Sequence, residues 1–310
     1  MFTQNDALRD FHGITAWHKA GYTGKGMVAG LGEDFTTGGT RTHAYQTYEV
    51  LKEVAPDCDV AYIDTFGTYD ENYMLEQTNL MRELGVCVWS ISQGLNEPDA
   101  TPINEYKAAP FERVKDFCFC CCAIGNDSFN SIQNLAKAPF VYGVGAIKLL
   151  YGEPTPEHFS SESTEHLDFC ACDRWHVSSG DLSGTSFSSP ALEGMTALVQ
   201  QFFKEKTGKV LSSEAMYRFL KDNTVDFWYD GKDNKTGWGY IVLPDPATIR
   251  VEDYIVTDEE TEAKVAAAST WAQEAWRKAI LKGITDGTNP QGNITREQVV
   301  VMLDRLGVLK

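Results

Sequence analysis

The segment GTSFSSP at residues 184–190 combines features that a nucleophilic serine requires. Gly184 permits a tight turn, and Pro190 is tolerated in a helix mainly near its start, so a helix is predicted to begin close to Ser186. Free N–H groups and the dipole at a helix start stabilise developing negative charge. The pattern predicts attack by the Ser186 hydroxyl on a carbonyl carbon. A serine-rich turn can also merely cap a helix, and the apolar helix after Pro190 favours the nucleophile.

A nucleophilic serine needs a general base, and the six histidines of the chain differ in their surroundings. They are His12, His18, His43, His158, His166 and His176. His43 is predicted to open the amphipathic helix HAYQTYEVLKEV at 43–54, in which apolar residues recur at helical spacing. A base at the start of a helix can face a nucleophile, so we predict that His43 takes the proton of Ser186. The alternative is a surface histidine at a helix N-terminus.

The elements that would position these side chains follow from alternating patterns along the chain. Short apolar runs that end near Gly, Asn, Asp or Ser occur at residues 27–32, 59–63, 86–92, 117–124 and 140–146. Continuous apolar runs are typical of strands buried on both faces of a parallel sheet. Helical spacing recurs between and after them, at 43–54, 73–84 and 190–204. Strands alternating with helices predict right-handed βαβ units and a three-layer α/β domain.

The stretch GTSFSSPALEGMTALV from Gly184 resembles the nucleophile motif of the subtilases, which usually reads GTSxAxPhvaG. The resemblance spans roughly residues 13–245, and its motifs follow the family order of acid, histidine, asparagine and serine. VAPDCDV at 54–60 is similar to the turn after the family's histidine helix, although His43-Ala44-Tyr45 replaces the usual His-Gly-Thr. The resemblance implies a subtilisin-like αβα domain with a mostly parallel sheet and serine endopeptidase activity.

The resemblance also implies roles for further residues. Asn126, in CCAIGND at 121–127, matches the asparagine whose amide donates to the oxyanion, although a GN pair is also common in turns. Residues of three segments match the peptide-binding groove. They are Ser92, Gln93, Gly94, Ala123, Ile124, Gly125 and Thr185.

The acid of the triad is the position that the sequence leaves open. The segment TGKGMVAGLGEDFTTGG at 23–39 can be compared with the family's first strand without gaps, counting from Gly26. This comparison places Glu33 at the family's aspartate, and a one-residue slip places Asp34 there. Either carboxylate could accept the His43 Nδ1 proton and hold the useful tautomer. We expect Glu33, with Asp34 as the second choice.

After residue 249 the composition changes. Residues 250–262 are rich in Asp and Glu and predict a linker. Residues 263–310 predict a small helical hairpin, with Trp271, Ala275 and Trp276 on one helical face and Thr295 capping a second helix. This part resembles one S-layer homology (SLH) module. The resemblance implies binding to cell-wall polysaccharide or to a protein partner, and a lone module fits a phage or prophage enzyme.

Composition and charge exclude several classes of protein. The net charge of -17 and the pI of about 4.7 disfavour nucleic acid and anionic membranes as partners. No long apolar run predicts a membrane span, and no basic segment with an apolar core predicts a signal peptide, so the chain is expected to be cytoplasmic when made. Eight cysteines, four of them in FCFCCCAIGN, predict reduced core residues; a metal site built on Cys170 and Cys172 is the alternative.

Two classes of function remain besides the endopeptidase. The chain could be a catalytically weak or inactive subtilase scaffold with a structural role, for example in a phage particle, or it could bind a cell-wall polymer through residues 263–310. The expected partner of the endopeptidase is a protein or peptide substrate. No cofactor is expected for this chemistry, and the resemblance leaves room for structural calcium without indicating ligands.

Overall fold

The computed structural model describes residues 1–33, 35, 38–64, 71–93, 105–128, 131–254, 258–281, 285, 287–293 and 296–305. The chain forms two compact units, Met1–Ile249 and Arg250–Lys310, which are described separately. Among the described residues, no helix is both long and apolar enough to cross a bilayer.

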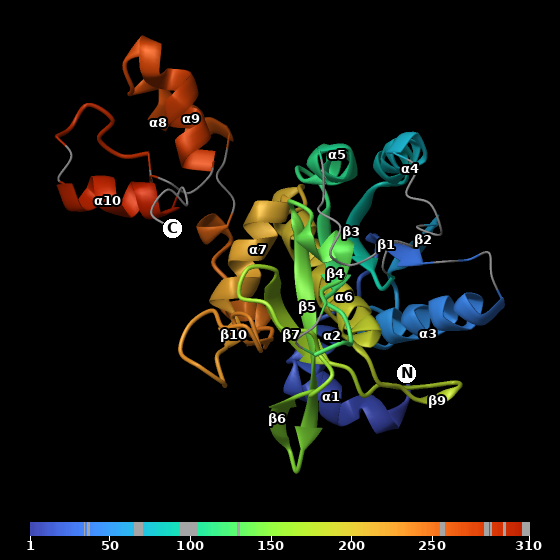
Figure 1. The fold of residues 1–310 in the computed structure, drawn as a ribbon. Coiled ribbons are helices and arrows are strands. Elements are labelled where there is room, and N and C mark those ends of the chain that lie inside the picture. Colours follow the sequence, from blue (N-terminus) through green and yellow to red (C-terminus); the bar gives the residue numbers. More distant parts are fainter. Residues whose placement is uncertain are drawn as a thin grey trace. The chain divides into compact units, whose positions relative to one another are not determined.

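The first unit is built on one large sheet, which runs through the middle of the domain (Figure 1). Nine strands of the described chain belong to it, in the order β10-β11-β7-β5-β4-β3-β1-β2, with β6 paired to β5. The strands are β1 (Val28–Glu33), β2 (Asp59–Asp64), β3 (Val86–Ile91), β4 (Phe119–Ala123), β5 (Val141–Leu150), β6 (Glu153–Pro156), β7 (Leu167–Cys172), β10 (Thr224–Val225) and β11 (Tyr240–Ile241). Neighbours pair in parallel except β5–β6 and β10–β11. A separate hairpin joins β8 (His176–Val177) and β9 (Gly180–Asp181).

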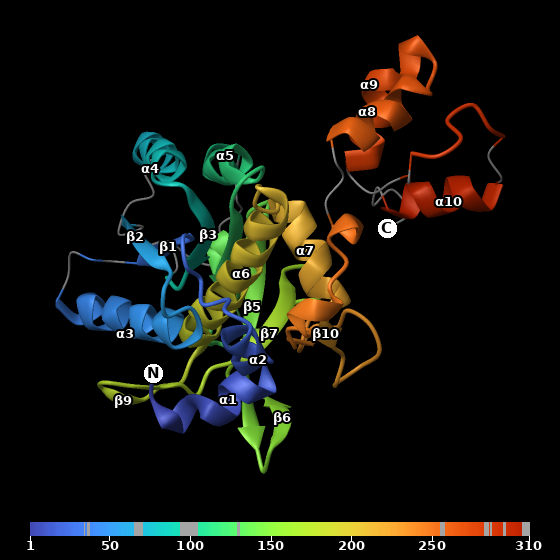
Figure 2. The ribbon, with the colours of Figure 1, turned by 180° about the vertical axis from the view of Figure 1, so that it is seen from behind.

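Helices cover both faces of the sheet. They are α1 (Asp6–Phe11), α2 (Ile14–Lys19), α3 (Gly38–Val54), α4 (Glu71–Leu84), α5 (Glu105–Val114), α6 (Thr185–Thr207) and α7 (Ser213–Asp222), with short 3-10 helices at Thr3–Asn5, Asn134–Lys137 and Pro246–Thr248. Because the chain reverses direction across the sheet after β2, right-handed connections place α3 on one face and α4 and α5 on the other. In Figure 2, α4 and α5 lie above strands β1 and β2 and α3 lies below them, while α6 runs in front of β5. The predicted three-layer αβα domain is therefore confirmed.

One glycine sets the distance between α3 and α6. A Cβ atom on Gly194 would lie 2.6 Å from Cβ of Val54, so only glycine allows the helices to pack this closely. This contact fixes α3, which carries His43, against α6, which carries Ser186.

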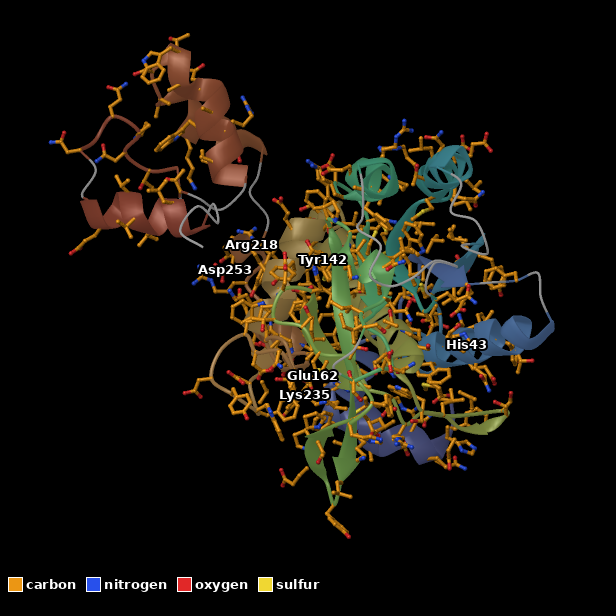
Figure 3. All side chains as sticks on the ribbon, in the orientation of Figure 1. His43, Tyr142, Glu162, Arg218, Lys235 and Asp253 are labelled. Carbon is orange, nitrogen blue, oxygen red and sulfur yellow. The ribbon has the colours of Figure 1, made fainter. Side chains whose placement is uncertain are left out.

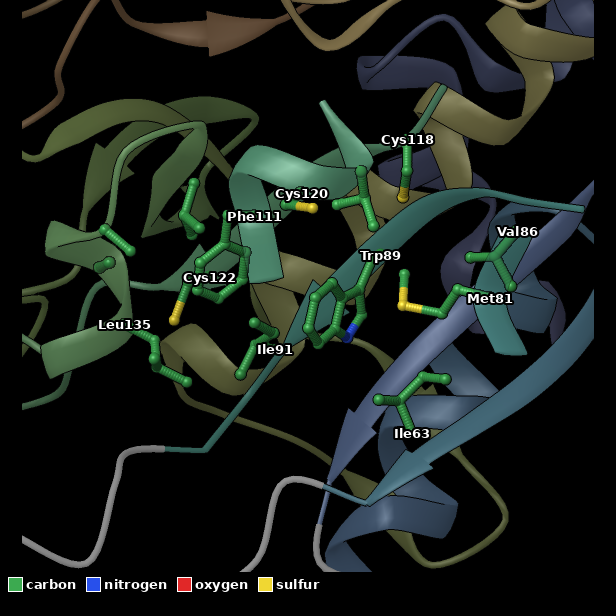
Figure 4. Close-up of a cluster of buried hydrophobic side chains, with 14 of the residues drawn as sticks. Ile63, Met81, Val86, Trp89, Ile91, Phe111, Cys118, Cys120, Cys122 and Leu135 are labelled. Atoms are coloured by element: carbon green, nitrogen blue, oxygen red, sulfur yellow. The ribbon is translucent and has the colours of Figure 1, made fainter. Parts of the chain in front are cut away.

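The core on the α4 and α5 face is a cluster of buried apolar side chains around Trp89 and Phe111 (Figure 4). Cys118, Cys120 and Cys122 belong to this cluster. All eight cysteines of the chain are buried and carry free thiols. They act as small apolar residues that fill space between larger side chains.

The second unit contains α8 (Asp258–Ala266), α9 (Gln273–Leu281) and α10 (Arg296–Arg305), with short 3-10 helices at Val251–Asp253 and Thr270–Ala272. The predicted linker 250–262 and module 263–310 both fall in this unit, but α8 crosses the expected boundary between them. Part of the predicted linker is helical, since Asp and Glu are favourable in the first turn of a helix, and the division into linker and module stays a prediction. Thr295, the predicted cap, lies outside the described residues, although α10 begins at the next position.

Candidate active site

Functional side chains gather where the parallel strands end. Glu33 is the last residue of β1, Ser92 follows β3, and Asn126 lies just beyond β4. The Ser92 N–H donates to the Gly32 carbonyl at 3.3 Å, which ties these strand ends together. Because the carboxyl ends of parallel strands meet at one edge, the sheet itself brings these residues into one region.

His43 pairs with Glu33. Nδ1 of His43 lies 3.0 Å from Oε2 of Glu33, whose side chain is 0% exposed, whereas the His43 side chain is 30% exposed. Figure 3 shows His43 on α3. The expectation that His43 opens its helix was wrong, because α3 begins at Gly38, upstream of His43. Asp34, the second candidate for the acid, lies outside the described residues.

Two opposing effects set the pKa of His43. Burial lowers it, but the hydrogen bond to Glu33 and the Glu33 charge together outweigh burial and raise the pKa above its usual value. The second oxygen of Glu33, Oε1, is buried and has no hydrogen-bond partner in the described structure. With Nδ1 engaged by Glu33, the imidazole Nε2 is available as the acceptor that a general base requires.

Ser186 lies in the first turn of α6, and a proline shapes its surroundings. Pro190 lies beyond this turn rather than within it as expected, so the Ser186 carbonyl lacks the N–H donor that residue 190 would normally supply. The Ser92 hydroxyl donates to that carbonyl instead, at 2.9 Å. In return, Ser186 Oγ donates to the Ser92 carbonyl at 3.3 Å. The next side chain, Phe187, packs on His43 with ring centroids 5.6 Å apart, so the histidine faces the start of α6.

Asn126 is oriented by the start of the same helix. Its Oδ1 accepts hydrogen bonds from the Thr185 backbone N–H at 2.9 Å and from the Thr185 hydroxyl at 3.0 Å. A backbone N–H can only donate, so the amide oxygen must face Thr185 and the NH₂ group must point away. The Asn126 side chain is exposed. In the described structure the NH₂ group makes no hydrogen bond, and it lies beside Thr185, the residue before Ser186.

The remaining predicted groove residues differ in accessibility. Ala123, Ile124, Gly125 and Thr185 are buried, Ser92 is 7% exposed, and Gln93 is half-buried. The Ile124 backbone is engaged within the fold, since its N–H donates to Val144 and its carbonyl accepts from Gln133. Gly94 lies outside the described residues.

Comparison with known families agrees with this geometry. The model of the subtilase family of S8 peptidases matches residues 26–239, which is more than half of the chain. The chain belongs to the subtilase family. It is therefore a subtilisin-like serine endopeptidase by class. No protein of curated function shows a significant match.

Solved structures share the subtilase fold at low sequence identity. A lanthipeptide protease superposes with a TM-score of 0.60 at 14% identity, covering 77% of this chain and 93% of its own. The prenylagaramide maturation protease PagA gives 0.62 at 16%, covering 79% and 99%. Fervidolysin from Fervidobacterium pennivorans, a keratinolytic enzyme, gives 0.62 at 15%, covering 80% and 48%.

Two buried carboxyl groups of this subtilase were missed by the sequence analysis. Glu193 of α6 accepts from the backbone N–H of Ser90 at 3.1 Å and from its hydroxyl at 2.8 Å. Asp173, directly after β7, accepts from the Gly184 N–H at 2.9 Å and from the Ser183 hydroxyl at 3.2 Å. Strand β7 (LDFCAC) was itself not predicted, and an aspartate after such an apolar run would have been the signal for Asp173.

No group of three or more His, Cys, Asp or Glu side chains among the described residues is arranged to hold a metal ion. Burial raises the pKa of the thiols of Cys170 and Cys172, and each thiol carries the added effect of a nearby acidic charge. These two cysteines are core residues of β7 in this structure.

Proposed function

We propose that this subtilase cleaves peptide bonds through an acyl-enzyme on Ser186, with His43 as general base and Glu33 as the acid of the triad. The observation that carries the proposal is the hydrogen bond between the buried Glu33 carboxylate and His43 Nδ1, at 3.0 Å, beside the helix that starts at Thr185. A carboxylate on Nδ1 selects the tautomer in which Nε2 accepts a proton.

The acylation step begins with a change at Ser186. Its hydroxyl rests on the Ser92 carbonyl, and rotation about χ1 would turn Oγ toward His43 Nε2. As Oγ attacks the scissile carbonyl carbon, its proton passes to Nε2, and the imidazolium is stabilised by Glu33. His43 then protonates the leaving amine, and water releases the acyl group by the reverse sequence.

The negative charge on the tetrahedral intermediate needs donors that are already in place. The Asn126 amide is one, because Thr185 holds its oxygen and no residue that the structure describes accepts from its NH₂ group. The Ser186 backbone N–H, at the start of α6, is the second. Preorganised donors of this kind stabilise the transition state more than the substrate.

The substrate proposed is a peptide or protein. The similar structures are described as a lanthipeptide protease, the prenylagaramide maturation protease PagA and a keratinolytic enzyme, and proteases act on polypeptide chains. For residues 263–310 we keep the proposal of a binding module for cell-wall polymer or a protein partner. The Trp271 side chain, which is 90% exposed, favours such a role, since exposed indoles are common contact groups. Retention of the chain on purified cell walls, lost in Trp271→Ala, would test it.

Labelling with a fluorophosphonate tests the nucleophile directly. We expect the natural chain to be labelled at Ser186 and to hydrolyse casein, and Ser186→Ala to lose both properties with an unchanged melting temperature. Ser188→Ala is a matched control, since the Ser188 hydroxyl is buried in the same helix and makes no hydrogen bond in the described structure. Equal labelling of Ser186→Ala would contradict the mechanism, and an unlabelled natural chain would favour the inactive scaffold.

A further inference from the structure

The turn that leads into Ser186 is tied to the sheet by one carboxyl group. Asp173 follows the last residue of β7, and its backbone N–H donates to the Ile147 carbonyl of β5 at 3.0 Å. Its Oδ2 accepts from the Gly184 N–H at 2.9 Å and from the Ser183 hydroxyl at 3.2 Å. The Asp173 side chain is 0% exposed. A rigid strand end therefore holds the two residues that precede the nucleophile helix.

This tie is needed because of the local backbone. Gly184 has φ of 141° and ψ of 151°, a conformation that L-amino acids rarely adopt, and although its carbonyl accepts from the Phe187 N–H at 2.9 Å, its own N–H precedes the helix and needs a side-chain acceptor. The next N–H, that of Thr185, is held by Asn126. Consecutive backbone amides are thus held by two different side chains, Asp173 and Asn126. Of the two, Asp173 is the one that can carry a charge, and charge-assisted hydrogen bonds are the stronger kind.

We propose that Asp173 is a positioning residue for catalysis, whose carboxylate fixes the Gly184 amide and so sets the place of Ser186 relative to His43 and the oxyanion donors. The inference rests on the proposed function of Ser186. A displacement of about 1 Å in a reacting group can cost on the order of 100-fold in rate, so such an anchor acts on turnover more than on substrate binding.

The charges around Asp173 decide when the anchor is ionised. In the described structure these are Arg174, whose Nε lies 3.6 Å from Oδ1, and Glu157, which is itself paired with Arg174 at 2.5 Å and with Lys148 at 3.0 Å. Burial raises the pKa of Asp173 to about 6, helped by the Glu157 charge and opposed mainly by the Gly184 hydrogen bond. The anchor is charged above this pH and neutral below it.

The sign of the pH effect follows. As pH falls through about 6, Asp173 gains a proton and becomes a weaker acceptor for Gly184. His43, whose pKa is raised above its usual value, is already becoming protonated there and ceases to be a base. Because neutral Asp173 still leaves part of the activity, the acid limb of log(kcat/KM) should be steeper than a slope of one over an interval below pH 6 and return to about one at lower pH. In Asp173→Asn the slope should stay near one.

The test compares Asp173→Asn with Asp168→Asn. Asp168 is a matched control because it is also buried in β7 and accepts a backbone N–H, that of Gly143, at 3.1 Å, but it lies at the start of the strand, away from Ser186. We expect Asp173→Asn to lower kcat about 10- to 100-fold, as for the loss of one charge-assisted hydrogen bond, with KM changed much less. Asp168→Asn should lower stability and leave kcat within about two-fold. Equal kcat in the natural chain and Asp173→Asn would overturn the inference.

A readout that does not need activity separates this inference from the proposed function. The amide proton of Gly184 in the ¹H–¹⁵N spectrum should titrate with a midpoint near 6, and this titration should disappear in Asp173→Asn. Equal chemical shifts of the Gly184 amide at pH 8 in the natural chain and in Asp173→Asn would overturn the anchor. If the titration is present but a fluorophosphonate does not label the natural chain, the proposed function of Ser186 fails, and the catalytic purpose of the anchor fails with it.

Discussion

At the scale of single residues, the acid beside His43 is a glutamate that reaches the imidazole from the end of a buried strand. Glu33 and Gly32 are neighbours in β1 and face opposite sides of the sheet. On the side that Gly32 faces, Trp89 fills the space, since its Nε1 would lie 2.8 Å from a Cβ at that position. Successive strand residues face opposite sides of the sheet. Glu33 therefore faces α3, and its longer side chain spans the remaining distance to His43.

Replacing this acid tests the pair. We expect Glu33→Gln to lower kcat by on the order of 10,000-fold, by analogy with a triad aspartate changed to asparagine. The residual activity should have its acid limb at lower pH, because the hydrogen bond and charge that raise the pKa of His43 are weakened and burial lowers it. Asp34→Asn is the comparison variant. A larger loss in Asp34→Asn, measured from complete pH profiles, would mean that Asp34 is the acid.

The oxyanion role of Asn126 is testable with two variants. Asn126→Ala should lower kcat about 100- to 1,000-fold, the usual loss for one oxyanion donor. Asn126→Asp keeps an acceptor for Thr185 but has no NH₂ group, and it should be at least as impaired. Normal turnover of Asn126→Asp would show that the residue only orders the turn.

At the scale of elements, α6 carries a buried acid as well as the nucleophile. Burial raises the pKa of Glu193 well above its usual value, against the two hydrogen bonds from Ser90, and the Glu33 charge adds to the rise. The folded chain thus holds a proton that the unfolded chain releases above the ordinary glutamate pKa. Since the folded state binds more protons in that range, this group makes the fold less stable as pH rises.

Glu193→Gln should remove this penalty. The amide can accept from the Ser90 N–H and donate to the Ser90 hydroxyl without a charge to bury. We expect its melting temperature to exceed that of the natural chain at pH 8, by about 2–4 °C for each kcal/mol regained, and to match it near pH 4. Thermal unfolding at both pH values is the measurement. A variant that is less stable at pH 8 would show that Glu193 is ionised in the fold.

Much of the sheet could be predicted from the apolar runs in the sequence. The five apolar runs correspond to β1 to β5, because strands buried on both faces need continuous apolar residues. Strand β7 escaped prediction because Asp168 interrupts its apolar run, and its charge is balanced by Lys232, sixty-four residues away in the sequence. The start of α3 upstream of His43 escaped too, since Gly38 and Gly39 are poor helix formers whose place depends on the fold.

Part of the candidate site could also be predicted from the sequence. Ser186 is signalled by a local motif, whereas the choice between Glu33 and Asp34 depends on which one faces α3. The tie between Asp173 and Gly184 depends on packing between distant segments. No spacing rule along the chain reports such contacts.

At the scale of the whole molecule, the chain divides after Ile249. The first unit contains the whole sheet and the residues proposed for catalysis, so a chain that ends at residue 249 should fold and keep its activity. We expect its melting temperature and kcat to stay close to those of the full chain. Insoluble or unfolded product from this truncation would show that Arg250–Lys310 completes the core of the first unit.

Because all eight thiols are buried, their chemical modification can report local unfolding of the sheet. All eight thiols are buried, and burial raises the pKa of Cys87 to about 11, so iodoacetamide at neutral pH meets no exposed sulfur in the folded chain. Alkylation should therefore proceed only through unfolding. Because the cysteines lie in β3, β4 and β7 and directly before β2 and β4, the pattern of adducts in a mass spectrum would report which part of the sheet separates first.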